Sequence, residues 1–192
     1  GPMIRATQGE RIRVVLENQL EVPTTIHWHG VPLPNAMDGV PDVTQEPVTP
    51  GGTFIYEFDA NVPGTYFYHS HVGLQLDRGL LGSLVIDPAE PERLADREFL
   101  LMLDDWLPTS PDDAMAAMMA TTPGMGGDMM GGGMMGGGMA GTSSATEPPY
   151  AGYLANGRLG SHAESLSVTR GERVRFRVVN GSAATTHRVG LV

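Results

Sequence analysis

Two histidine motifs constrain the fold of this chain more than any other feature of its sequence. Four of the six histidines lie in two His-x-His units, His27-Trp28-His29 and His69-Ser70-His71. Both units lie in strand-like segments, and the side chains of a strand alternate between its two faces. The two histidines of each unit therefore share one side, and the middle residue faces the other. Two such strands lying side by side would gather four imidazole rings around one point.

The flanking sequence favours an all-β fold. Polar and apolar residues alternate over residues 11–16, as in a half-buried strand. Four further strand-like segments cover residues 24–29, 54–58, 64–69 and 82–86. Glycine and proline residues separate these segments. Short strands at this spacing predict a β-sandwich or a β-barrel.

The chain also contains an internal repeat. Residues 9–15 recur, with substitutions, as residues 171–177. Duplication of a β-domain is the simplest explanation, and chance similarity between two strands that follow a glycine is the alternative. The same offset places Val189 and Leu191 where the first copy has its first histidine pair. We therefore expect the second copy to lack these ligands.

The segment between the two copies differs in composition. Ser110 is suited to cap a helix that begins at Pro111, and the two aspartates that follow suit the positive end of a helix. We therefore expect a short helix there. Residues 124–141 contain ten glycines and six methionines. Such a segment buries too little apolar surface to offset the entropy lost on ordering, so we expect it to be mobile.

Charge and cysteine content exclude several classes of function. The chain has 22 acidic and 12 basic residues and a net charge of −10, which argues against nucleic acids and anionic membranes as partners. The absence of cysteine excludes disulfides, thiolate metal sites and cysteine nucleophiles within this sequence. No apolar run in it reaches the roughly 18 residues of a membrane-spanning helix.

The two histidine units favour a metal site. A single unit can be structural, because a histidine can donate a hydrogen bond to a backbone carbonyl. Two units of the same spacing are better explained as ligands, since neutral imidazole binds zinc, copper, iron and nickel. Structural zinc usually recruits cysteine, and catalytic zinc often adds a carboxylate. Copper accepts imidazole ligands and heads the affinity order, so copper is the favoured metal and zinc the alternative.

The segments that carry the histidines resemble the first cupredoxin domain of a multicopper oxidase. The resemblance rests on Thr25-Ile26-His27-Trp28-His29-Gly30, Asp38-Gly39-Val40-Pro41 and the run from Gly64 to His71, and it continues through residues 75–86. Residues 156–158 and 171–180 resemble the beginning of the family's second domain. The resemblance implies a cupredoxin-like Greek-key β-sandwich in two tandem copies, the second of them incomplete.

The same resemblance divides the chain into three parts. Residues 1–88 would form the first cupredoxin domain, without its N-terminal strand. Residues 89–149 would form a connection and the start of the second domain, including the short helix and the Met- and Gly-rich insert. Residues 150–192 would form part of a ligand-free second domain, like the middle domain of a three-domain oxidase. We therefore expect the chain to be a fragment of a longer protein.

The family's chemistry assigns a role to each histidine. Its members couple four one-electron oxidations to the reduction of dioxygen to two waters, using a type 1 copper and a trinuclear cluster of one type 2 and two type 3 coppers. Carried over by resemblance, His27 ligates the type 2 copper. His29 and His69 share one type 3 copper, and His71 ligates the other. Asp38 matches an acid that helps deliver protons to bound dioxygen, and its alternative role is that of an ordinary turn residue.

The chain also departs from the family pattern. The family's cluster needs eight histidines, and this sequence matches four of them. The others belong to a last domain with a His-x-x-His-x-His unit and a His-Cys-His unit, whose cysteine ligates the type 1 copper. His187 does not begin the first of these units, because Gly190 stands where the next histidine is needed, and His162 is expected at the surface. The chain alone is expected to be inactive, and it needs a C-terminal cupredoxin domain from the same or another chain.

The methionines indicate a substrate. Thioether sulfur prefers cuprous ion, and Met-rich inserts occur in bacterial copper-tolerance oxidases that this sequence resembles. The candidate cuprous-ion contacts are Met115, Met118, Met119, Met125, Met129, Met130, Met134, Met135 and Met139. The alternative is a surface helix and a flexible insert without a metal role. The resemblance thus implies a secreted oxidoreductase of copper homeostasis, periplasmic or extracellular, that oxidises cuprous ion and phenols.

Functions from other classes stay open. A copper-binding or storage protein would hold copper on the same side chains without consuming dioxygen. A degenerate cupredoxin scaffold would bind no metal tightly. Copper nitrite reductase, another cupredoxin enzyme, is disfavoured because it needs a cysteine in its first domain.

Overall fold

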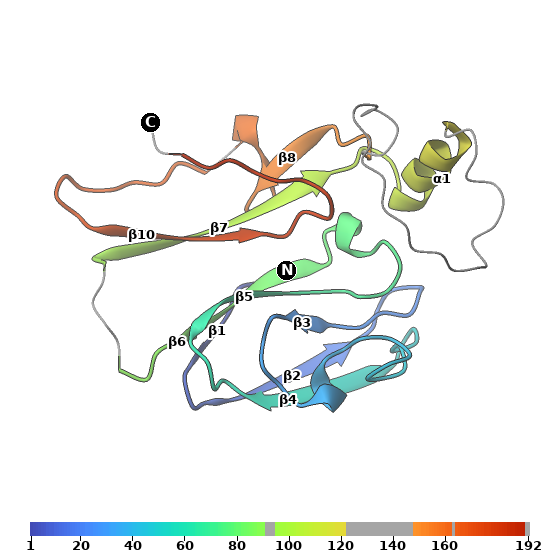
Figure 1. Ribbon diagram of the computed structural model, residues 1–192, viewed down its shortest axis with the longest axis horizontal. Helices are drawn as coiled ribbons and strands as arrows, with labels where there is room; N and C mark the ends of the chain where they lie inside the picture. The colour runs from blue at the N-terminus through green and yellow to red at the C-terminus, as the bar shows by residue number, and fades with distance from the viewer. Residues whose placement is uncertain (91–94, 122–147, 163, 191–192) are drawn as a thin grey trace, which may run out of the picture.

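The computed structural model describes residues 1–90, 95–121, 148–162 and 164–190 (Figure 1). Strands make up most of the regular structure in these ranges, and α1 (Pro111–Thr121) is their one α-helix. The strands are β1 (Ile4–Thr7), β2 (Arg11–Glu17), β3 (His27–His29), β4 (Thr53–Asp59), β5 (Gly64–His69), β6 (Leu81–Asp87), β7 (Arg97–Trp106), β8 (Gly152–Ala155), β9 (Arg158–Leu159) and β10 (Val174–Asn180). Three short 3-10 helices are η1 (Asn35–Met37), η2 (Leu76–Arg78) and η3 (Gly160–His162). The predicted all-β class is confirmed.

Two sheets of the N-terminal half form a sandwich. One has the strand order β1-β6-β5-β3, and the other pairs β2 with β4 in antiparallel orientation. Between them, Trp28, Tyr56 and Phe58 are almost completely buried. The Trp28 ring lies 5.7 Å from that of Tyr56 and 4.9 Å from that of Phe58, with edge-to-face geometry in both pairs. Burial of such large aromatic side chains provides much of the stabilisation of this core.

The observed strands differ from the predicted ones mainly next to the first histidine unit. Residues 24–26 do not continue β3, because Thr24 forms only a single bridge to Val48 and the backbone N–H of Ile26 donates to the hydroxyl of Tyr56 (2.9 Å). β1 was not predicted, since a strand of four residues is too short to show clear alternation. It pairs in parallel with β6 and lies at one edge of the first sheet.

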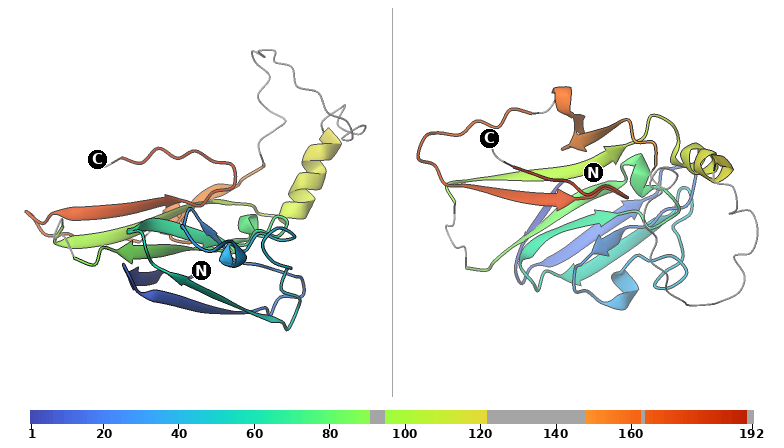
Figure 2. Two further views of the ribbon diagram at one scale, coloured as in Figure 1. Left: turned by 60° about the horizontal axis from the view of Figure 1, so that its bottom comes forward. Right: turned by 45° about the horizontal axis from the view of Figure 1, so that its top comes forward.

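The sheet β10-β7-β8-β9 lies against this sandwich in all the views of Figures 1 and 2. Arg177 of β10 connects this sheet to the sandwich. Its guanidinium pairs with Glu98 (2.8 Å) and Asp87 (3.5 Å) and donates a hydrogen bond to the hydroxyl of Thr65 (2.7 Å). Arg5 of β1 pairs with the same two carboxylates, at 2.6 Å from Asp87 and 3.1 Å from Glu98. These two arginines and two carboxylates therefore form one network of ion pairs between the β1-β6-β5-β3 sheet and the β10-β7-β8-β9 sheet.

The internal repeat gives the same turn twice but different strand pairing. Gly9 and Gly171 both have a left-handed backbone, with φ of 90° and 92°. In each turn the carboxylate of the next glutamate accepts a hydrogen bond of 2.7 Å, from the backbone N–H of Thr7 in the first copy and Thr169 in the second. The strand after the first turn, β2, is antiparallel to β4, whereas β10 is parallel to β7. Leu191, a predicted counterpart of a histidine, lies outside the described residues.

Helix α1 begins as predicted. The hydroxyl of Ser110 accepts a hydrogen bond from the backbone N–H of Asp113 (3.1 Å), which caps the helix before Pro111. Asp112 in its first turn pairs with Arg78 of η2 (2.7 Å) and joins the helix to the segment that follows β5. The glycine- and methionine-rich residues 124–141 lie outside the described residues. None of the helices in the described ranges is long and apolar enough to cross a membrane.

Candidate metal centre

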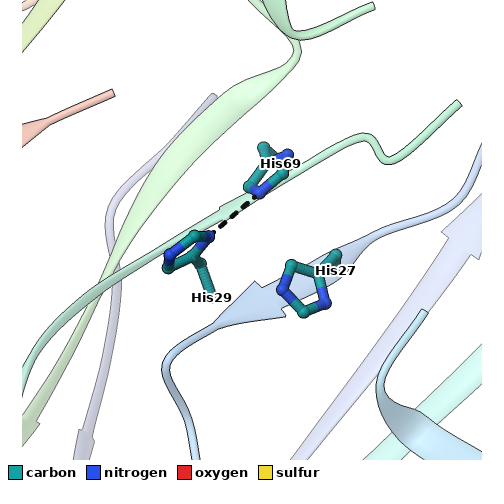
Figure 3. A group of neighbouring side chains, drawn as sticks. All are labelled: His27, His29 and His69. Atoms are coloured by element: carbon teal, nitrogen blue, oxygen red, sulfur yellow. Dashed lines mark hydrogen bonds between the residues drawn. The ribbon is translucent and has the colours of Figure 1, made fainter. Parts of the chain in front are cut away.

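Antiparallel pairing of β3 with β5 brings the two histidine units together. His27 lies directly opposite His69, and His29 lies opposite Phe67. The ring centroid of His27 is 5.6 Å from that of His29 and 5.3 Å from that of His69. Figure 3 shows the three rings facing one another from two neighbouring strands. The convergence predicted from strand alternation is therefore present for these three side chains.

Backbone carbonyls determine which ring nitrogens are free. Nδ1 of His27 lies 2.7 Å from the carbonyl oxygen of Asp38, and Nδ1 of His69 lies 2.8 Å from that of Ser70. Each Nδ1 can donate its proton there, which leaves Nε2 with a free lone pair. His29 instead presents Nδ1, which lies 3.3 Å from Nε2 of His69 (Figure 3).

These nitrogens fit a metal. Two nitrogens 3.3 Å apart can both lie about 2.0–2.1 Å from a single ion at an angle close to tetrahedral. The candidate ligand atoms of His27, His29 and His69 all lie within 4.8 Å of one another, and among the described residues no other group of three histidine or acidic side chains does so. A donor set made only of imidazole suits copper better than magnesium or calcium, which require oxygen ligands.

His71 lies beside this group but outside the tight triplet. Its ring centroid is 5.4 Å from that of His27 and 6.0 Å from that of His69. It follows the last paired residue of β5 and is exposed, as is His29. All four predicted histidines therefore meet at one end of the sheet, and two of them face outward.

The surroundings of two rings favour their neutral forms. His29 is exposed as a residue, but partial desolvation of its ring lowers its pKa below the ordinary value, and the nearby imidazoles of His27 and His71 lower that pKa further. Burial also lowers the pKa of His69, although its hydrogen bond to the carbonyl of Ser70 opposes that effect. Both shifts favour the unprotonated ring, the state in which imidazole can bind a metal.

Gly39 allows Asp38 to approach His27. Gly39 has φ of +78°, and a Cβ atom at this position would overlap the carbonyl oxygen of Ile26. Only glycine therefore lets the turn lie directly against the beginning of β3. The half-buried carboxylate of Asp38 lies 3.4 Å from Nδ1 of His27, next to the backbone contact that fixes the ring. The structure thus places the predicted acid beside the cluster.

Several neighbours of the cluster were not predicted to have a role at the site. Phe67 stacks on His29, with centroids 4.5 Å apart, and on His69, with centroids 5.2 Å apart. Ser70, the middle residue of the second unit, belongs to a buried polar group with Thr24 and Gln75. Strand alternation could have identified Phe67, since it lies two residues before His69. The polar group depends on a contact between distant segments and leaves no local signal.

The remaining candidate residues lie elsewhere. Met115 and Met118 are half-buried on α1, and Met119 is exposed there. The other candidate methionines, Met125, Met129, Met130, Met134, Met135 and Met139, lie outside the described residues. His162 is exposed on η3, as predicted, and His187 lies 2.8 Å from the hydroxyl of Ser182 in the second half of the chain.

Comparisons with family models and with known proteins point to the same family. Residues 1–91 and residues 97–191 each match a family model described as multicopper oxidase. The chain is similar to the multicopper oxidase MmcO of Mycobacterium tuberculosis (39% identity over 100% of this chain and 39% of that protein). It is also similar to copper resistance protein A of Escherichia coli (34% identity over 96% of this chain and 34% of that protein).

Solved structures agree with these relatives. The crystal structure of Fet3p, a multicopper oxidase that functions in iron import, matches 95% of this chain and 31% of its own chain, with a TM-score of 0.75 and 26% identity. Together these matches support the cupredoxin-like sandwich fold. The chain spans between a third and two fifths of the length of the two curated relatives.

Proposed function

This chain belongs to the multicopper oxidase family, and we propose that it supplies half of the histidine ligands of a trinuclear copper site that reduces dioxygen to water. The single observation that carries the proposal is the convergence of imidazole nitrogens from β3 and β5 within 4.8 Å. His27 is assigned to the type 2 copper. His29 and His69 are assigned to one type 3 copper and His71 to the other. The 3.3 Å separation between Nδ1 of His29 and Nε2 of His69 supports a shared ion.

The residues around the cluster hold its ligands in a usable state. Bound copper would supply dioxygen binding and the transfer of four electrons. The backbone carbonyls of Asp38 and Ser70 fix the rings of His27 and His69 so that Nε2 stays free. The carboxylate of Asp38 is half-buried, and it can exchange protons with solvent beside the cluster. We assign it the delivery of protons to reduced oxygen.

The other half of the site would come from a C-terminal cupredoxin domain. His29 and His71 are exposed at the end of the sheet, so a further domain can approach them directly. The partial coverage of the curated relatives agrees with an origin of that domain in the same protein, and a second chain is the alternative. The domain would also carry the type 1 copper, since this sequence has no cysteine.

Cuprous ion is the proposed substrate, with phenols as a second class. The similarity to copper resistance protein A supports a role in copper homeostasis. Met115 and Met118 offer thioether sulfur near the surface of α1, and such sulfur favours the cuprous state. A periplasmic or extracellular location is proposed with this role, and fractionation of the source cells would test it.

The test uses the full-length protein. We expect it to bind the complement of one type 1 copper and one trinuclear cluster, and to consume dioxygen with cuprous ion or a phenol. His29→Gln should abolish dioxygen uptake, whereas the control His162→Gln, at an exposed histidine of η3, should retain it. Tight copper binding without dioxygen uptake would instead favour the storage protein. A full-length protein that binds no copper would contradict both functions.

A further inference from the structure

We propose that Thr24, Ser70 and Gln75 form a positioning cluster that sets the geometry of the second histidine pair, an inference that rests on the function proposed above. The side chains belong to residues only 4%, 6% and 8% exposed, in that order. Burying polar groups is costly unless each finds a hydrogen-bond partner. Three polar residues buried together beside the metal site therefore require hydrogen-bond partners, and they provide them for one another.

The hydrogen bonds of this cluster admit one arrangement. Oε1 of Gln75 accepts from the hydroxyl of Thr24 at 2.7 Å and from the hydroxyl of Ser70 at 2.6 Å. Each hydroxyl has a single proton, and both protons are used on this oxygen because these are the shorter contacts. The 3.2 Å contact between the hydroxyl oxygens of Thr24 and Ser70 then carries no proton. Nε2 of Gln75 donates to the carbonyl oxygen of Pro23 at 2.8 Å. A reversed amide would place an oxygen against that carbonyl, so the orientation of Gln75 is fixed.

Ser70 connects the cluster to both histidines of its unit. It stands between His69 and His71, and its hydroxyl donates to Oε1 of Gln75. Its hydroxyl oxygen also accepts a hydrogen bond from the backbone N–H of Val72 at 3.2 Å, immediately after His71. Since β5 ends at His69, strand pairing does not hold His71 in place. The hydroxyl of Ser70 constrains the backbone where the sheet no longer does.

The cluster also joins the two histidine units to each other. Pro23 and Thr24 lie in the segment that leads into β3, whereas Gln75 lies in the segment that follows His71. The first unit is anchored by Trp28 in the apolar core, and the second by this polar group. Hydrogen bonds are directional, so the cluster fixes the relative placement of the two segments more narrowly than apolar contact would. The rings of His27 and His71, one from each unit, lie 5.4 Å apart, and this separation is what the cluster would set.

The experiment compares variants of the full-length, copper-loaded protein. Thr24→Val keeps the shape of the side chain and removes its hydroxyl, whereas Thr24→Ser keeps the hydroxyl. Ser70→Ala removes the second hydroxyl and tests the positioning role independently. Ile12→Val, in the apolar core, is the stability control. Copper affinity by chelator competition, the EPR spectrum of the cupric protein and the melting temperature are measured for each variant.

A positioning role predicts a change at the metal. Thr24→Val and Ser70→Ala should weaken the affinity for at least one copper by about 10- to 100-fold and alter the EPR spectrum, as loss of a residue that orients ligands does elsewhere. Thr24→Ser should restore both. If Thr24→Val and Ser70→Ala lower only the melting temperature, as Ile12→Val does, the cluster is merely structural and the inference is overturned while the proposed function stands. If the unaltered protein binds no copper, the proposed function is contradicted, and the inference that rests on it is contradicted as well.

Discussion

Replacement of Gly39 by alanine tests how closely the Asp38 turn must approach the metal site. The added Cβ has two effects that can be separated. It forces a residue with a side chain into a left-handed backbone (φ +78°), which costs about 1–2 kcal/mol. It also overlaps the carbonyl oxygen of Ile26, so the turn must move away from β3.

Displacement of the turn has a second cost. The carbonyl oxygen of Asp38 would no longer accept the hydrogen bond from Nδ1 of His27, now 2.7 Å long. Leaving a partly buried donor without its acceptor costs about 1–3 kcal/mol. The two terms add to roughly 2–5 kcal/mol, and a released His27 ring should weaken copper binding by about 10- to 100-fold.

Gly51→Ala is the matched control. Gly51 has a similar φ of +74°, but a Cβ atom there would have no neighbour within 4 Å. Gly51→Ala should show only the cost of placing alanine in a left-handed backbone, which for a chain of this size lowers the melting temperature by a few degrees. Thermal unfolding of both variants and chelator competition for copper measure the difference. A Gly39→Ala variant that is as stable as Gly51→Ala and binds copper as tightly as the unaltered protein would show that the turn need not lie against β3.

Three further changes have expected outcomes. Trp28→Ala should destabilise the protein by about 3–5 kcal/mol in denaturant titrations, because it opens a cavity in the core of the sandwich, and a loss below 1 kcal/mol would contradict that packing. The lowered pKa values of His29 and His69 favour their neutral forms in the folded state, so this stabilisation is present above pH 6.5 and is lost as the pH falls below that value. Thermal unfolding of the metal-free protein between pH 5 and 8 should show the decline, and a flat profile would refute it. Burial raises the pKa of Asp104 to about 6, and ionisation above that pH opposes folding. Asp104→Asn should therefore raise the melting temperature more at pH 8 than at pH 5, and its side-chain oxygen can still accept the hydrogen bond from the backbone N–H of Asp105.

The candidate site was partly predictable because strand alternation is a local property. His27 and His29 share a face by spacing alone, as do Phe67 and His69. The choice of ring nitrogen at His27 was not predictable, because it depends on the carbonyl oxygen of Asp38, eleven residues away. The contact of Ser70 with Thr24 spans 46 residues, and no local pattern marks it.

The two copies of the internal repeat share their local turns. The glycine turns before β2 and β10 have nearly the same φ, and each is closed by a glutamate at the same hydrogen-bond distance. Asn18 and Asn180 likewise each accept a hydrogen bond from the backbone N–H two residues on. These contacts span two or three residues, so the same local sequence produces them in both copies.

Strand pairing did not follow from the repeat. β2 pairs with β4 and β10 pairs with β7, in opposite orientations, although their sequences are similar. The partner of a strand depends on which distant segment offers a complementary face and edge, and for β10 that includes the ion pairs of Arg177 with Glu98 and Asp87. The turns, the alternation and the shared face of His27 and His29 therefore follow from the local sequence. The pairing of β3 with β5 depends on the tertiary structure, and it brings both histidine units to one end of the sheet.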